Sequence, residues 1–187
     1  RLCVTVTAAT MAELRTRRDA VADGADMVEL RLDTVSDPSA AGALAGRKKP
    51  VLVTCRHRDE GGYFAGTEEE RRRILAEALS LGAEFVDVEW NRACADLIQQ
   101  SGGRRIVLSH HDFSGVPADL GQKASAMLGS GAEVVELGGG QALATMLAYT
   151  RGTDALHTAY SFAFLGERPD APTVARQLAP WAAGEGW

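Results

Sequence analysis

Hydrophobic positions along the chain fall into short runs separated by longer segments with helical spacing. The runs are rich in β-branched residues and have the length of strands, at residues 2–6, 27–32, 51–55, 85–90, 106–109 and 134–137, with a weaker candidate at 156–164. Between them, apolar residues recur at intervals of three and four, which predicts covering helices at residues 11–22, 67–81, 94–100 and 117–128. This alternation of strands and helices is typical of an α/β fold.

One helix boundary is marked clearly, at Thr67. The sequence Thr-Glu-Glu-Glu from Thr67 to Glu70 has the spacing of a capping box, and its acidic residues suit the positive end of a helix. The charged run that follows, through Arg73, predicts a solvated helix face.

A glycine-alanine-acid motif followed at once by a strand occurs three times, beginning at Gly24, Gly82 and Gly131. Each glycine is expected to end a helix, and the repeat predicts parallel strands joined by right-handed crossovers. Acids and bases follow nearly every strand, which favours a (β/α)8 TIM-type barrel over a doubly wound sheet. The sequence after the first strand is not a glycine-rich phosphate loop. Residues 1–187 are interpreted as a single domain.

Composition narrows the classes of partner. The chain has 187 residues, of which 45% are hydrophobic, so disorder is excluded and a substantial core is expected. A formal net charge of -5 argues against nucleic acid and against a polybasic membrane anchor, and leaves a small molecule as the expected partner. No apolar run approaches the roughly 20 residues needed to span a bilayer, so we expect a soluble protein without a targeting segment.

The cysteines carry no sign of a metal site or a disulfide framework. The three cysteines, Cys3, Cys55 and Cys94, are widely spaced, and none belongs to a Cys-x-x-Cys pair or a Cys/His cluster. We therefore expect no metal and a reducing, cytoplasmic location.

Charged residues near two strand ends are candidate ligand contacts. Glu29 and Arg31 alternate along one strand and point to the same face, either lining a barrel interior or forming a buried ion pair. Arg56 opens a charged loop with adjacent glycines at 61 and 62, which allow close approach to a ligand; a flexible surface loop is the alternative.

A histidine pair follows the run at 106–109. An imidazole at a strand end suits general acid or base chemistry because its ordinary pKa is about 6.5. A surface turn is the alternative, and a shared metal is disfavoured because adjacent residues of a strand face opposite ways. We interpret His57, His110 and His157 as ordinary polar residues.

Four motifs together resemble the type I 3-dehydroquinate dehydratase family, (β/α)8 enzymes of the shikimate pathway. They occur in the family's order: Val-Glu-Leu-Arg-Leu-Asp at 28–33, Thr-Cys-Arg at 54–56 with Glu-Gly-Gly at 60–62, Val-Asp-Val-Glu at 86–89, and Ser-His-His-Asp-Phe at 109–113. The resemblance implies a barrel fold and dehydration of 3-dehydroquinate to 3-dehydroshikimate through a lysine imine. No metal or nucleotide cofactor is implied.

The resemblance also implies roles for individual residues. His111 matches the proton-transfer histidine, Glu60 the carboxylate that assists it, and Asp87 an acid that helps hold the histidine side of the site. The positions expected to contact substrate are Glu29, Arg31 and Arg56.

The chain departs from the family pattern at the imine-forming lysine. Glu136 occupies that position, and the lysines of the chain, Lys48, Lys49 and Lys123, are expected on the opposite rim or in an outer helix. A complete barrel typically needs about 250 residues. We therefore expect either a degenerate last third or missing segments near residues 136–141 and 152–158.

The leading interpretation is a 3-dehydroquinate dehydratase-like hydro-lyase, and assembly as a homodimer is compatible with it. The alternative is a catalytically silent protein that binds a shikimate-pathway acid through Arg31 and Arg56. A third interpretation is another lyase or aldolase that uses His111 and Glu60 without covalent catalysis, and detection of a divalent metal would favour it.

Overall fold

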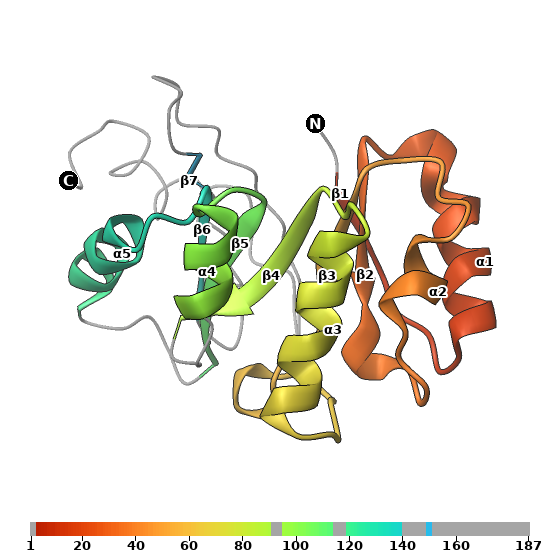
Figure 1. Cartoon of the computed structure of the whole chain (residues 1–187), viewed down its shortest axis with the longest axis horizontal. Coiled ribbons are helices and arrows are strands. Elements are labelled where there is room, and N and C mark those ends of the chain that lie inside the picture. Colours follow the sequence, from red (N-terminus) through yellow and green to blue (C-terminus); the bar gives the residue numbers. More distant parts are fainter. Residues whose placement is uncertain (1–2, 91–94, 114–118, 140–148, 151–187) are drawn as a thin grey trace, which may run out of the picture.

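The computed structural model describes residues 3–90, 95–113, 119–139 and 149–150 (Figure 1). The strands of these residues form one sheet in the order β1-β2-β3-β4-β5-β6-β7. The first six run parallel, and β7 is antiparallel to β6. The strands are β1 Cys3–Val6, β2 Met27–Arg31, β3 Val51–Thr54, β4 Phe85–Glu89, β5 Ile106–Asp112, β6 Val134–Gly139 and β7 Tyr149–Thr150.

Helices alternate with the parallel strands, as the periodicity predicts. They are α1 Met11–Val21, α2 Ala40–Leu44, α3 Glu68–Ser80, α4 Ala95–Ser101 and α5 Leu120–Gly129, with 3-10 turns at Ala22–Gly24, Leu32–Thr34 and Arg58–Glu60. The parallel strands form a curled sheet of the kind found in part of a (β/α)8 barrel, which confirms the predicted fold class. The predicted strand at 156–164 lies outside the described residues.

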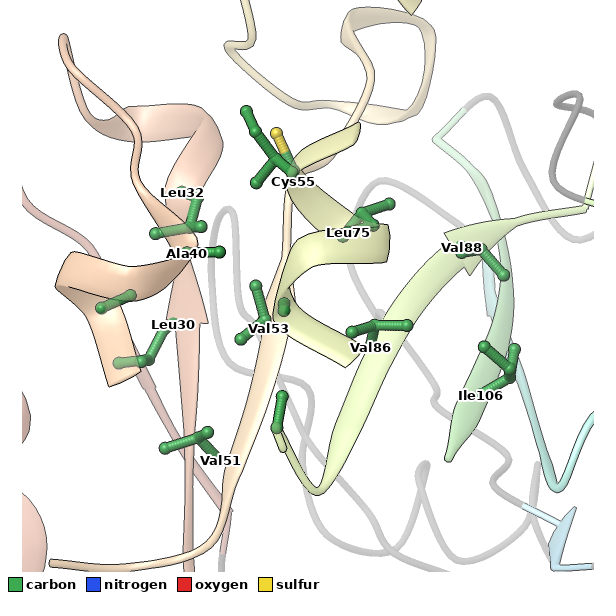
Figure 2. Close-up of a cluster of buried hydrophobic side chains, with 14 of the residues drawn as sticks. Leu30, Leu32, Ala40, Val51, Val53, Cys55, Leu75, Val86, Val88 and Ile106 are labelled. Atoms are coloured by element: carbon green, nitrogen blue, oxygen red, sulfur yellow. The ribbon is translucent and has the colours of Figure 1, made fainter. Parts of the chain in front are cut away.

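The two faces of the sheet carry different layers. The outer layer is the larger core, in which β2, β3 and β4 pack against α2 and α3 (Figure 2). The inner face has a small apolar floor formed by Leu52, Val107 and Val134. Because side chains alternate along a strand, the residues two positions further on return to this inner face, and they include Thr54, Ser109 and Glu136. The inner face is therefore apolar near the strand starts and polar near their carboxyl ends.

Local signals fix several boundaries. The capping box is confirmed, since Thr67 Oγ1 accepts from the Glu70 amide at 3.2 Å and the Glu70 carboxylate accepts from the Thr67 amide at 2.7 Å. Gly82 and Gly131 have left-handed φ values of 86° and 93° just after α3 and α5, as expected for helix ends. The prediction is wrong for Gly24, which lies in a 3-10 turn and is not among the positive-φ glycines.

Two other expectations are wrong. β5 continues through Asp112 because β6 pairs alongside it to Gly139, so His110 and His111 lie in the strand and not after it. The charged run of α3 is not wholly solvated, because Arg71 is fully buried.

No helix in the described part of the chain is long and apolar enough to cross a membrane.

Candidate active site

Charged side chains gather at the carboxyl ends of the parallel strands, on the inner face. They come from β2, β4, β5 and β6 and from the segment after β3: Glu29, Arg31, Arg56, Glu60, Asp87, Glu89, His111 and Glu136. In (β/α)8 enzymes this end of the barrel carries the active site. The structure thus brings the six residues singled out from sequence, together with Glu136, to one rim.

Arg56 is buried and reaches from the end of β3 to β4 and β5. Its guanidinium pairs with both carboxylate oxygens of Asp87, at 2.9 and 3.0 Å, and also donates to Ser109 Oγ. Ser109 in turn donates to Asp87 at 2.8 Å. Burial opposes the charge of Arg56, but Asp87 and the other acids outweigh it and raise the pKa of Arg56. Asp87 therefore orients Arg56 directly.

The pKa of Asp87 itself is raised, first by burial. Arg56 opposes this change, whereas the carboxylates of Glu136 and Glu89 add to it. The acids of the inner face thus repel one another and depend on the guanidinium between them.

A tight turn brings Glu60 back over the end of β5. Gly61 has a left-handed φ of 77°, and a Cβ on Gly62 would lie 1.9 Å from the carbonyl oxygen of Arg56. Neither position accommodates a side chain without rearrangement. The loop at 56–62 is therefore closely packed around Arg56 and Glu60, which are both buried.

His111 lies between two carboxylates. Its Nδ1 is 3.3 Å from Glu60 Oε2, and its Nε2 is 3.1 Å from Glu136 Oε1. The main-chain amide of His111 also donates to Glu60 at 3.0 Å. Burial lowers the pKa of His111, but the hydrogen bonds to Glu136 and Glu60 outweigh burial and raise the pKa to about 9. At neutral pH the ring is an imidazolium that donates on both sides.

Gly138 makes room for this ring. It pairs with His111 across β5 and β6, and a Cβ at this position would lie 2.7 Å from His111 Cδ2. Phe113 stacks on the imidazole, with ring centroids 6.3 Å apart. The position of the imidazole thus depends on a glycine at position 138. Sequence reasoning did not identify this role of Gly138.

His110 is not an ordinary surface residue. It is buried, and its Nδ1 lies 3.6 Å from Glu60 Oε1, because Glu60 returns across the end of β5 and faces both histidines. Within the described residues, neither ring nitrogen of His110 has a hydrogen bond. His57 is half-buried and caps the following turn by accepting from the Asp59 amide at 3.1 Å. His157 lies outside the described residues.

On β2, Glu29 and Arg31 have separate partners. Glu29 accepts from Thr5 and Thr54, at 2.6 and 2.7 Å, and so ties three strands together. The Arg31 guanidinium pairs with both oxygens of Asp33, at 2.8 and 2.7 Å, so the alternative of a Glu29–Arg31 ion pair is wrong. A fifth of the Arg31 side chain is exposed, which leaves its guanidinium within reach of a carboxylate ligand.

A buried ion pair supports the rim from outside. Arg71 of α3 pairs with Glu89 and donates to the Cys55 carbonyl at 3.0 Å, and Glu89 accepts from the His57 amide at 2.8 Å. This network fixes the chain on both sides of Arg56. Arg71 shares a helical stripe with the buried residues Ile74, Leu75 and Ala78, and that spacing is the signal that would have marked it as buried.

The lysines of the chain lie away from this rim. Lys48 and Lys49 precede β3, at the opposite end of the sheet, and Lys123 of α5 pairs with Asp119 at 3.2 Å. Glu136, in contrast, is buried beside His111. The described residues contain no group of three or more His, Cys, Asp or Glu side chains arranged to hold a metal ion. The arrangement instead offers proton donors, proton acceptors and guanidinium groups for an anionic ligand.

Comparison with known proteins identifies relatives of this chain. The family model of type I 3-dehydroquinase matches residues 2–139. A 3-dehydroquinate dehydratase of Methanothrix thermoacetophila is 34% identical over 119 residues, which cover 63% of this chain and 52% of that protein. One from Desulfotalea psychrophila is 39% identical over 95 residues, covering 48% of this chain and 42% of that protein.

Solved structures give the same result for the fold. The 3-dehydroquinate dehydratase of Geobacillus kaustophilus matches with a TM-score of 0.63 and 26% identity, over 73% of this chain and 60% of that one. The enzyme of Enterococcus faecalis matches with a TM-score of 0.61 and 25% identity, over 73% and 64% of the two chains. The chain spans about half the length of the curated relatives it matches.

Proposed function

Because the chain belongs to the type I 3-dehydroquinase family, we propose that it dehydrates 3-dehydroquinate to 3-dehydroshikimate, a step of the shikimate pathway. The observation that carries this proposal is the position of His111, held between two carboxylates on a rim with two guanidinium groups. Dehydration removes a proton and a hydroxide, so it needs an acceptor and a donor side by side.

The residues of the rim divide into two groups in this proposal. Arg31 is partly exposed and binds the substrate carboxylate, with Arg56 and Glu29 on the neighbouring strands contacting the rest of the molecule. His111 serves proton transfer, and Glu60 assists it by holding the ring. Asp87 keeps the guanidinium of Arg56 in place.

The proposed reaction in this chain does not pass through an imine. A carboxylate cannot form one, and Glu136 lies where the family resemblance places the lysine. We accordingly assign the chemistry to the acids and bases around His111. A metal and a nucleotide are not part of the proposal.

The test is an ultraviolet assay for the conjugated enone product after addition of 3-dehydroquinate. We expect turnover by the unaltered chain, a loss of about 100-fold or more for His111→Gln, and a raised KM for Arg31→Gln. Arg15→Gln is the matched control, since its exposed side chain lies outside the rim, and it retains turnover. Absence of product from the unaltered chain would refute the proposal.

A second candidate is a catalytically silent protein that binds a shikimate-pathway acid. The specific observation in its favour is Glu136, which takes the place of the nucleophilic lysine. Saturable binding of 3-dehydroquinate that is lost in Arg56→Ala, without product, would select this candidate.

The cytoplasmic location and the homodimer remain predictions. Sedimentation of the purified chain would test the dimer, and cell fractionation the location.

A further inference from the structure

His111 is arranged to donate protons from both nitrogens of its ring. Carboxylates face both ring nitrogens, Glu60 from the 3-10 turn after β3 and Glu136 from β6. The nearby cation is Arg56, which opposes the charge of His111 but is itself held by Asp87 of β4. A doubly donating imidazolium has no free lone pair, so its chemistry is proton donation.

The proton acceptor must then be another group of the rim. Asp87 is held by Arg56 and Ser109, and Glu89 by Arg71 and the His57 amide.

Glu60 already accepts from the amide of His111 and faces its ring. Glu136 differs from these acids. Within the described residues, its hydrogen bond is to His111 alone, and it uses one carboxylate oxygen.

The β6 strand brings acceptor and donor together. Glu136 and Gly138 lie two residues apart on the same face, and the absence of a side chain at Gly138 lets the His111 ring lie against β6. Nε2 and Oε1 are 3.1 Å apart, so one substrate can face both groups. A side chain at position 138 would meet the His111 ring and separate it from Glu136.

We propose that Glu136 is the general base, and His111 the general acid, of a dehydration that needs no covalent intermediate. This inference rests on the proposed function. Glu136 takes the C2 proton of 3-dehydroquinate, and the electron pair of that C–H bond moves into the C3 carbonyl as an enolate. The enolate then forms the C1–C2 double bond. The C1–O bond breaks, and the leaving oxygen takes the Nε2 proton of His111 and departs as water.

The cycle closes without a co-reactant. After water leaves, Glu136 is neutral and carries the substrate's proton, while His111 is a neutral imidazole. The proton crosses the hydrogen bond from Glu136 to Nε2, which restores the carboxylate and the imidazolium. Glu60 holds Nδ1 throughout and is a positioning residue in this scheme.

Glu136→Gln is the decisive variant, because glutamine keeps the shape and removes the base. We expect kcat to fall by about 100-fold to 10000-fold with KM little changed, and exchange of the C2 proton in deuterium oxide to be lost. Glu136→Asp should retain part of both activities. Glu69→Gln, an exposed acid of α3, is the matched control and keeps both.

A second readout needs no turnover. In nuclear magnetic resonance titrations of the full chain, the pKa of the His111 ring is expected near 9 and lower in Glu136→Gln, because a charged acceptor at Nε2 is lost. An unchanged pKa in that variant would overturn the inference even if the variant were inactive.

The outcomes separate this inference from the proposed function. If the unaltered chain forms product and Glu136→Gln forms it equally fast, the assignment of Glu136 is refuted and the dehydratase function stands. If the unaltered chain forms no product, the proposed function fails and the inference fails with it. Loss of turnover and of C2 exchange in Glu136→Gln, with the control unaffected, supports it.

Discussion

Raising the pH through the range in which His111 loses its proton should destabilise the folded chain. The pKa of the ring is about 9 in the folded state and about 6.5 in an unfolded chain. A folded pKa above the unfolded one means that the imidazolium stabilises the fold fully below about pH 6.5 and that this contribution is lost as the pH rises through 9. The two pKa values correspond to about 3 kcal/mol.

The assay is urea unfolding at about pH 6, 7.5 and 9.5, for the unaltered chain and for His111→Asn. Other groups also titrate in this range, so the relevant quantity is the difference in the free energy of unfolding between the two proteins. We expect this difference to shrink by about 3 kcal/mol between the lowest and the highest pH. His57→Asn serves as the control and should follow the unaltered chain. A difference independent of pH would refute the assignment of an imidazolium between Glu60 and Glu136.

Three further substitutions test other parts of the account. Arg71→Met removes the guanidinium that pairs with buried Glu89 and should lower the free energy of unfolding by about 3 to 5 kcal/mol in urea. Thr67→Ala removes the cap of α3 and should cost about 1 kcal/mol, seen as a lower Tm; an unchanged Tm would argue against the capping box. Gly138→Ala places a methyl group against His111 and should lower the pKa of the ring in a nuclear magnetic resonance titration, whereas an unchanged pKa would show that the ring does not depend on this glycine.

The fold was predictable because its signals are local. The spacing of hydrophobic residues along the chain distinguishes strands from helices. The Gly-Ala-acid repeat marks where a helix ends and the next strand begins, as observed at Gly82 and Gly131. Gly24 shares the repeat but ends a 3-10 turn, which three residues of sequence cannot distinguish. The end of β5 depends on pairing with β6, between residues 27 positions apart in the sequence. The pattern of apolar residues within β5 alone therefore ends too early.

The residues that form the site could be predicted from the sequence, but the hydrogen bonds and ion pairs between them could not. Strand-end position and family resemblance selected Glu60, Asp87 and His111, because polar residues within or just after apolar runs are conspicuous. The partner of each group depends on side-chain reach across strands. Arg31 therefore pairs with Asp33, although alternation on β2 suggested Glu29. Likewise, His110 lies beside a carboxylate that returns from residue 60.

The measurement that tests the central claim most directly is the intact mass of the unaltered chain, taken after borohydride is added during turnover of 3-dehydroquinate. The account predicts formation of the enone product with an unmodified protein mass, because Glu136 stands beside His111 and the lysines of the chain lie elsewhere. A mass increased by the reduced substrate adduct would contradict it, since only an imine with an amine of the chain is trapped in that way.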